Sequence, residues 1–162
     1  MEKIKALMST VEKNNMSAYF ANDKKEAAKI AESLLKDGDT VAVGGSMSLF
    51  ECGIIDMLRI GKYNFLDRYE KNLTRNEIND IFVRSFSADA YLSSVNAITQ
   101  NGEIYNVDGN GNRVAAIMYG PKSVILVVGK NKIVKDINAA VEYVKSVSAP
   151  KNCVRLSKNT YC

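Results

Sequence analysis

Residues 40–46 read Thr-Val-Ala-Val-Gly-Gly-Ser, a short β-branched run that stops at two glycines. This composition is typical of a buried strand whose end opens into a turn. Residues 123–128, Ser-Val-Ile-Leu-Val-Val, form a longer apolar run that predicts a strand covered on both faces and central in its sheet. Residues 88–95 predict a further strand between these two. Together the three runs predict a buried sheet.

Amphipathic segments alternate with these strands. Asp23 with Glu26 and Thr74 with Glu77 have the three-residue spacing of helix caps. The apolar spacing predicts helices at residues 2–13, from Asp23 to Gly38, from Thr74 to Phe86, at 114–119 and from Ile133 to Pro150. Alternating helices and buried strands predict an α/β fold, three-layer αβα with a mostly parallel sheet. Ligands in such folds bind beyond the carboxyl ends of the strands.

Two segments are expected to lie outside this alternation. Residues 17–21 predict a short strand, and residues 98–105 predict a β-hairpin excursion because Asn101-Gly102 favours a type I′ turn. We expect one domain over residues 1–162, with residues 151–162 as a polar C-terminal tail.

Charge and hydropathy exclude two classes of partner. Lys and Arg number 22 against 18 Asp and Glu, and the basic residues are scattered along the chain, so nucleic-acid binding is not expected. No apolar run approaches the ~18 residues of a membrane span, and the amino-terminal residues do not resemble a signal peptide. We therefore expect a cytoplasmic protein with no membrane contact.

The absence of histidine narrows the possible chemistry. It removes Ser-His and Cys-His nucleophile pairs and most transition-metal sites. The three cysteines, Cys52, Cys153 and Cys162, are far apart and form no Cys-x-x-Cys pair, so no metal site and no iron–sulfur cluster is expected within the chain. Cys52 is interpreted as a small core residue, and any cofactor is unidentified.

The glycine loop is the first candidate site. Two glycines after a strand can bring bare N–H groups toward a phosphate or carboxylate, and the alternative is a tight turn with Ser46 or Ser48 as an ordinary N-cap. Glu51, just beyond, is a candidate acid–base group or a solvent-facing carboxylate. The candidate ligand-binding residues of this loop are Gly44, Gly45, Ser46, Met47 and Ser48.

A second polar cluster flanks the predicted hairpin. Amides and an arginine fork suit oriented recognition of an anion, and Asp108 is the second candidate acid–base residue. Turn building is the alternative, with Arg113 as a buried clamp on loop carbonyls. We predict that Arg113 orients an anionic ligand and that the loop before it shapes the turn. The candidate residues are Asn96, Asp108, Gly109, Asn110, Gly111, Asn112 and Arg113.

At these residues the chain resembles the LUD (lactate utilisation) domain family. The resemblance covers nearly the whole chain. The matching motifs are Gly44-Gly45-Ser46-Met47-Ser48-Leu49 with Glu51 and Gly53, Ser94-Val95-Asn96-Ala97-Ile98-Thr99, the run from Asn106 to Ala115, Gly120-Pro121-Lys122, and the run from Gly129 to Val134.

The resemblance implies a fold similar to the sugar-phosphate isomerase and coenzyme A transferase group (NagB/RpiA-like). It also implies a bacterial lactate-utilisation subunit that binds an organic acid, or a phosphorylated or nucleotide-type ligand, and acts with iron–sulfur partner proteins in lactate oxidation. Two alternatives stay open: a stand-alone transferase, isomerase or ligase that acts on a phosphorylated or acyl substrate, and a non-catalytic assembly protein. The sequence also leaves open whether the chain forms a homo-oligomer. Relatives often continue into a cysteine-rich tail that the sequence does not contain.

Overall fold

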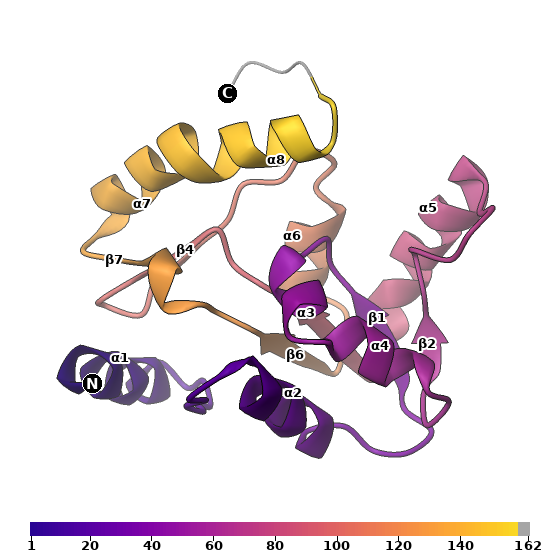
Figure 1. Ribbon diagram of the computed structural model, residues 1–162, viewed down its shortest axis with the longest axis horizontal. Coiled ribbons are helices and arrows are strands. Elements are labelled where there is room, and N and C mark those ends of the chain that lie inside the picture. The colour runs from indigo at the N-terminus through magenta and orange to yellow at the C-terminus, as the bar shows by residue number, and fades with distance from the viewer. Residues whose placement is uncertain (159–162) are drawn as a thin grey trace. The chain divides into compact units, whose positions relative to one another are not determined.

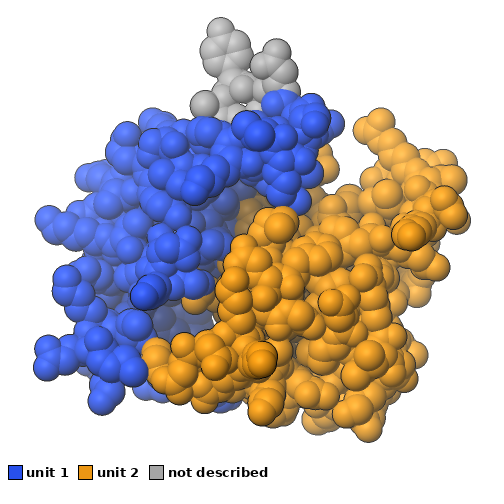
Figure 2. Space-filling model, in the orientation of Figure 1, with its two compact units in different colours: residues 1–19, 95–107, 129–162 blue, residues 20–94, 108–128 orange. Residues whose placement is uncertain are grey.

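The computed structural model describes residues 1–158, which form two compact units (Figure 2). Unit 1 comprises residues 1–19, residues 95–107 and the described residues from 129 onward. Unit 2 comprises residues 20–94 and 108–128. The expectation of a single domain over the whole chain stays a prediction, and Cys162 lies outside the described residues.

Unit 2 is built on a four-stranded parallel sheet with strand order β2-β1-β3-β6 (Figure 1). The strands are β1 (Thr40–Val43), β2 (Asn64–Leu66), β3 (Ala90–Ser93) and β6 (Ser123–Leu126). The predicted strands at residues 40–43, 88–95 and 123–128 are therefore confirmed.

The predicted central position of β6 is wrong. Within the described residues β6 pairs only with β3 and forms an edge of the sheet. Its apolar run reflects cover on both faces, since Ile125 packs in one hydrophobic cluster and Val124 in the other. Strand β2, whose three residues lack a clear apolar pattern, was not predicted.

Helices cover both faces of this sheet. The crossover from β1 to β2 contains α3 (Met47–Glu51) and α4 (Ile54–Arg59), which pack with α2 (Lys24–Ser33) on one face. On the other face lie α5 (Arg75–Arg84), which the 3₁₀ helix η1 (Ser85–Ser87) follows, and α6 (Asn112–Met118). The predicted three-layer αβα class is confirmed.

The helix starts follow the caps read from the sequence. The Asp23 carboxylate accepts a hydrogen bond from the Glu26 N–H at 2.8 Å. Thr74 and Glu77 form a reciprocal capping box at the start of α5. Gly53, at φ +73°, separates α3 from α4, because a left-handed residue ends the first helix and lets the chain begin another.

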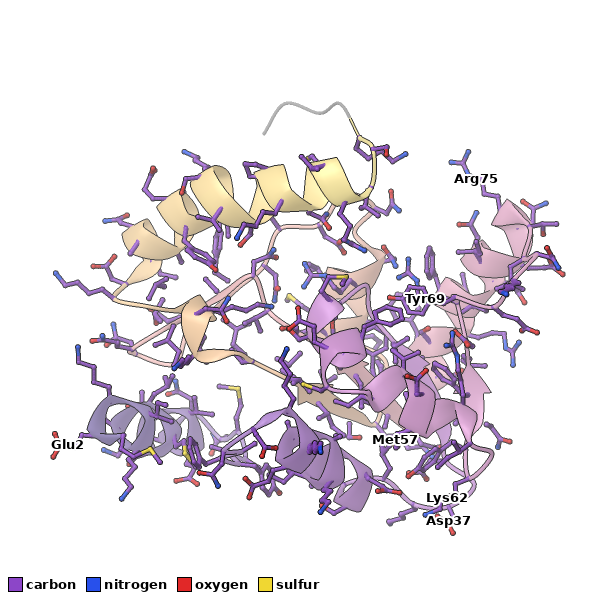
Figure 3. All side chains as sticks on the ribbon, in the orientation of Figure 1. Glu2, Asp37, Met57, Lys62, Tyr69 and Arg75 are labelled. Carbon is purple, nitrogen blue, oxygen red and sulfur yellow. The ribbon has the colours of Figure 1, made fainter. Side chains whose placement is uncertain are left out.

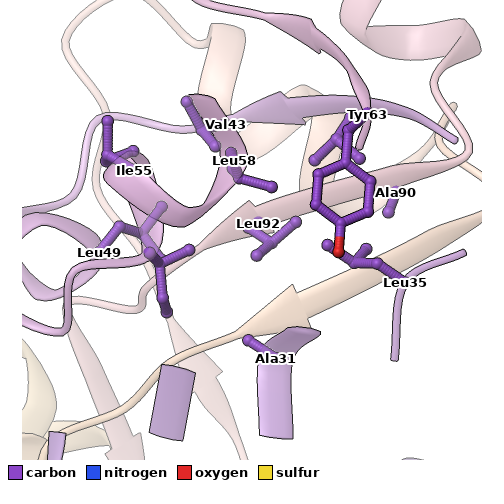
Figure 4. Close-up of a cluster of buried hydrophobic side chains, with 11 residues drawn as sticks. Ala31, Leu35, Val43, Leu49, Ile55, Leu58, Tyr63, Ala90 and Leu92 are labelled. Atoms are coloured by element: carbon purple, nitrogen blue, oxygen red, sulfur yellow. The ribbon is translucent and has the colours of Figure 1, made fainter. Parts of the chain in front are cut away.

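The main core of unit 2 fills the layer between the sheet and α2, α3 and α4 (Figure 4). Alternate strand residues point into it, so Val43 and Leu92 lie in this cluster while Ala42 and Tyr91 lie in the cluster on the opposite face. The buried residues of the main cluster are Ala31, Leu35, Val41, Val43, Leu49, Ile54, Ile55, Leu58, Tyr63, Ala90 and Leu92.

Unit 1 contains a small sheet of order β5-β4-β7. Strand β4 (Ala97–Thr99) pairs antiparallel with β5 (Ile104–Tyr105) and parallel with β7 (Ile133–Val134). Helix α1 (Glu2–Lys13) agrees with the predicted bounds, and α7 (Ile137–Tyr143) packs against the small sheet. The 3₁₀ helix η2 (Lys130–Lys132) precedes β7.

The carboxyl-terminal helix does not end at Pro150 as expected. A π-helical stretch, η3 (Val144–Ser148), joins α7 to α8 (Ala149–Arg155), and Pro150 occupies the first turn of α8. Proline has no N–H to donate and clashes with the carbonyl four residues earlier in a regular α-helix, and here it follows a π-helical stretch instead of regular α-helix. The helix also begins later than predicted, since Ile133 belongs to β7.

Two further expectations are corrected. Residues 17–21 form no strand and instead connect unit 1 to unit 2 as irregular chain. The predicted hairpin is present, but its turn is not type I′. Ile98 faces Ile104, the Thr99 N–H donates to the Glu103 carbonyl, and only Gly102 of the loop has positive φ. That pattern belongs to a three-residue loop with a left-handed glycine.

The core assignment predicts a large difference between two aliphatic residues at the end of α4. Leu58 is 1% exposed and Ile60 is 68% exposed. Leu58→Ala should lower the free energy of unfolding by about 2–5 kcal/mol because it leaves a cavity, whereas Ile60→Ala should change it by less than about 0.5 kcal/mol. Urea titration followed by circular dichroism measures both values. Equal losses would contradict the assigned core.

Candidate functional site

The candidate site lies at the carboxyl edge of the unit 2 sheet. Strands β1, β2 and β3 run parallel, so the segments that follow them emerge at the same edge. The chain passes from β1 to β2 on one side and then to β3 on the other side of β1. The edge between β1 and β3 is therefore the topological switch point, where ligands bind in open α/β sheets.

Gly44 sits at this switch point because the packing leaves no room for a side chain. Its N–H donates to the Leu92 carbonyl at 2.9 Å and continues the pairing of β1 with β3. A β-carbon at Gly44 would overlap the Ser93 hydroxyl and lie 2.9 Å from the Tyr91 hydroxyl and 3.0 Å from Cγ of Arg113. The absent side chain thus allows these three residues to converge on the end of β1.

The next two residues differ sharply from Gly44. Gly45 is exposed, and a β-carbon there would meet only Nη1 of Arg68, at 3.9 Å. Ser46 is 7% exposed, and its buried hydroxyl has no hydrogen-bond partner among the described residues. Buried hydroxyl groups are nearly always hydrogen-bonded, so this unpartnered group is an exception that needs an explanation.

The buried Arg113 and the half-buried Asp108 contact each other at the start of α6. The Asp108 carboxylate accepts hydrogen bonds from the N–H groups of Arg113 at 2.8 Å and Val114 at 3.1 Å. Nε of Arg113 lies 3.8 Å from Oδ1 of Asp108, and its Nη1 donates to the Ser94 carbonyl at 3.0 Å. These contacts are those of the clamp alternative. The ligand-orienting role of Arg113 stays a prediction.

Tyr91 contributes a buried hydroxyl to the same edge. Burial raises the pKa of Tyr91 to about 12, although Arg68 and Arg113 oppose this shift as nearby cations. The side chain is 2% exposed, and its hydroxyl lies 2.9 Å from the position that a β-carbon at Gly44 would take. At neutral pH Tyr91 is therefore a neutral donor.

Arg68 and Tyr69 are part of this edge and were not predicted. They follow β2, and the guanidinium of Arg68 lies 4.4 Å from the ring centre of Phe82 and 5.5 Å from that of Tyr69. Tyr69 also contacts the ring of Phe50, and Figure 3 shows it beside α3. Recognising β2 as a strand would have found these residues, because they come directly after its carboxyl end.

The other predicted residues are distributed differently. Gly109, Asn110 and Gly111 are exposed, Gly111 has φ +77°, and Asn112 begins α6, so this stretch forms the turn before the helix. Met47 is 46% exposed and Ser48 is half-buried, both in the first turn of α3. The five-residue length of α3 weakens the expected attraction between its amino terminus and an anion.

Asn96 lies in unit 1, where it forms hydrogen bonds across the open end of the hairpin. Its Oδ1 accepts a hydrogen bond from the Val107 N–H at 2.9 Å, and its own N–H donates to Oδ1 of Asn106 at 3.1 Å. These reciprocal contacts hold the two ends of the hairpin together. A ligand contact from Asn96 stays a prediction.

Glu51 and Cys52 have the surroundings of structural residues. The Glu51 carboxylate pairs with Lys24 at 2.9 Å, and both side chains are more than half exposed. This contact raises the pKa of Lys24, chiefly through the hydrogen bond from the ammonium to the carboxylate. Burial raises the pKa of the Cys52 thiol, which packs against the main core cluster.

Within residues 1–158 no group of three or more Asp, Glu or Cys side chains is arranged to hold a metal ion. Cys52 and Cys153 are free thiols. None of the helices in the described part of the chain has the length and apolar character needed to cross a membrane.

The fold and the residues at this edge define an α/β protein with polar groups gathered at its topological switch point. A family model, the LUD domain, matches residues 4–162, so the chain belongs to the LUD domain family and is associated with lactate utilisation. No curated protein matches the chain significantly in sequence.

An added methyl group should destabilise the protein at Gly44 and have little effect at Gly45. Gly44→Ala forces a contact with Ser93, Tyr91 and Arg113 and should lower the free energy of unfolding by about 1–3 kcal/mol. Gly45→Ala enters open space and should change it by less than about 1 kcal/mol. Thermal and urea unfolding of the two variants provide the comparison. Equal stability of both would show that the edge is looser than described.

The buried Tyr91 predicts a loss of stability in alkali. Its folded pKa of about 12 exceeds the unfolded value of 10.0, so its contribution is fully present below pH 10 and is lost as pH rises toward 12. Full loss corresponds to roughly 2–3 kcal/mol for two pKa units. Tyr91→Phe should match the wild type at pH 9 and be more stable than it at pH 11. Parallel pH profiles for the two proteins would contradict this.

Proposed function

We propose that this LUD-domain protein binds an anionic small molecule at the carboxyl edge of β1 and β3, and that it acts with iron–sulfur partner proteins in lactate oxidation. The ligand class covers organic acids and phosphorylated or nucleotide-type compounds. Family membership supports the metabolic role.

One observation carries the binding proposal, namely the buried hydroxyl of Ser46 without a partner. Leaving a buried hydroxyl unsatisfied costs about 1–3 kcal/mol, and a ligand oxygen that accepts or donates a hydrogen bond there would remove this cost. The exposed Gly45 next to it leaves its backbone accessible. Neighbouring Arg68 and Tyr91 add donors of the kind that an anion requires.

The same surroundings favour binding over turnover by this chain alone. Of the two candidate acid–base residues, Glu51 is exposed and paired with Lys24, and Asp108 accepts two backbone hydrogen bonds and faces Arg113. A general base needs a free lone pair within reach of a substrate proton. Both carboxylates are better explained as structural groups, so we assign no catalytic residue.

Two buried serines allow a matched test of the binding role. Ser85 is 4% exposed, and its hydroxyl donates to the Ile81 carbonyl at 2.7 Å, whereas Ser46 has no such partner. Ser46→Ala should keep or raise the melting temperature and weaken ligand binding by about tenfold or more. Ser85→Ala should lower stability by about 0.5–1.5 kcal/mol and leave the affinity of the folded protein unchanged.

The measurement is a thermal-shift screen of wild type with organic acids, sugar phosphates, nucleotides and coenzyme A, followed by calorimetric titration of both variants. Binding of no compound in the panel, or equal affinity of wild type and Ser46→Ala, would refute the site. A gene neighbourhood that encodes no iron–sulfur subunits would contradict the proposal that the protein acts with iron–sulfur partners.

A further inference from the structure

The positive charge at the candidate edge comes from Arg113 and Arg68, and only one of them is neutralised. Arg113 faces the Asp108 carboxylate and donates to the Ser94 carbonyl, so the Arg113 and Asp108 pair adds no net charge. A buried guanidinium held in this way is a fixed part of the scaffold.

Arg68 differs from Arg113 in both its burial and its lack of an ion-pair partner among the described residues. It is half-buried, and no carboxylate in residues 1–158 lies within ion-pair distance of it. The adjacent Asp67 is paired instead with Arg59 at 2.7 Å. The charge of Arg68 is therefore available to a ligand.

The aromatic contacts of Arg68 orient this charge. The central carbon of its guanidinium lies 4.4 Å from the ring centre of Phe82 and 5.5 Å from that of Tyr69, and these cation–π contacts hold the group in place. Its Nη1 lies 3.9 Å from the position that a β-carbon at Gly45 would take, so at least one donor nitrogen of the guanidinium is beside the glycine loop. Arg68 thus presents a planar fork of donors toward the glycine loop.

From this charge count we propose that Arg68 is the specificity-determining residue of the candidate site and that it selects ligands with a single carboxylate. This inference rests on the proposed function. One carboxylate balances the one available cation and fits a planar fork of donors. A phosphate monoester carries a charge of about −1.5 to −2 at pH 7, which exceeds the charge of Arg68. The surplus negative charge would be left unpaired in a partly buried site.

The remaining donors at this edge are neutral, which supports the same ligand class. Tyr91 keeps its proton at physiological pH because its pKa is raised to about 12, and Ser46 offers a hydroxyl. Such groups bind the uncharged oxygens of a ligand but do not neutralise a second negative charge.

Calorimetric titration of the full chain with pyruvate, propionate, inorganic phosphate and AMP tests the proposal. Wild type should bind the two monocarboxylates more tightly than phosphate or AMP. Arg68→Met, which retains an apolar side chain against Phe82, should weaken carboxylate binding at least tenfold, and Arg68→Lys should recover only part of the loss. The matched control is Arg75→Met, which removes the same charge from an exposed position at the start of α5 (Figure 3). It should leave the affinity unchanged.

Gly45→Val gives an independent readout if Arg68→Met does not fold. A valine at Gly45 enters open space toward Nη1 of Arg68, so the protein should remain folded and lose carboxylate binding.

The outcomes separate this inference from the proposed function. Tighter binding of phosphate or AMP than of the carboxylates would overturn the ligand class while the anion site stands. Carboxylate binding that survives Arg68→Met or Gly45→Val unchanged in a folded protein would overturn the role of Arg68. Binding of none of these probes, or of any compound in the wider panel, would overturn the proposed function and this inference with it.

Discussion

The ends of β1 and β3 approach each other so closely that a side chain at Gly44 would collide with the Ser93 hydroxyl. This approach brings together groups from segments that are distant in sequence. The Tyr91 hydroxyl, the Arg113 stem and the exposed Gly45 loop all take their positions from it. The clamp of Arg113 on Asp108 and Ser94 then fixes where α6 begins. The candidate edge is therefore a product of strand packing more than of loop conformation.

Much of this architecture could be predicted from local signals. The capping box of Thr74 and Glu77 and the β-branched run of β1 depend on neighbouring residues alone, and both appear as expected. Features that depend on tertiary partners could not be read in the same way. The apolar run of β6 agrees with packing on both faces of the sheet, although its residues are only half-buried, and the run did not indicate the strand order. Residues 17–21 have suitable residue types but no pairing partner among the described residues.

The candidate site likewise has features that local sequence signals indicated and others that depend on tertiary contacts. Glycines after a buried strand indicated the loop, and the polar run before Arg113 indicated a built turn, because both signals are local. The availability of Arg68 could not be predicted, since it depends on Asp67 being paired with Arg59 and on Phe82 lying beneath the guanidinium. Conversely, no local pattern indicated that the Asp108 carboxylate neutralises Arg113. Whether a charged side chain is neutralised depends on its contacts in the folded protein, and the composition of the chain does not indicate it.

The parallel order of the sheet has a consequence for the sequence of events in folding. The Thr40 N–H donates to Asp89, a residue 49 positions later, so the pairing of β1 with β3 closes a long loop of chain. Closing such a loop costs entropy before any contact compensates for it. During synthesis β1 can pair with β2 first, yet the edge at Gly44 does not exist until β3 has emerged from the ribosome. The candidate site is thus among the last parts of unit 2 that a growing chain can assemble.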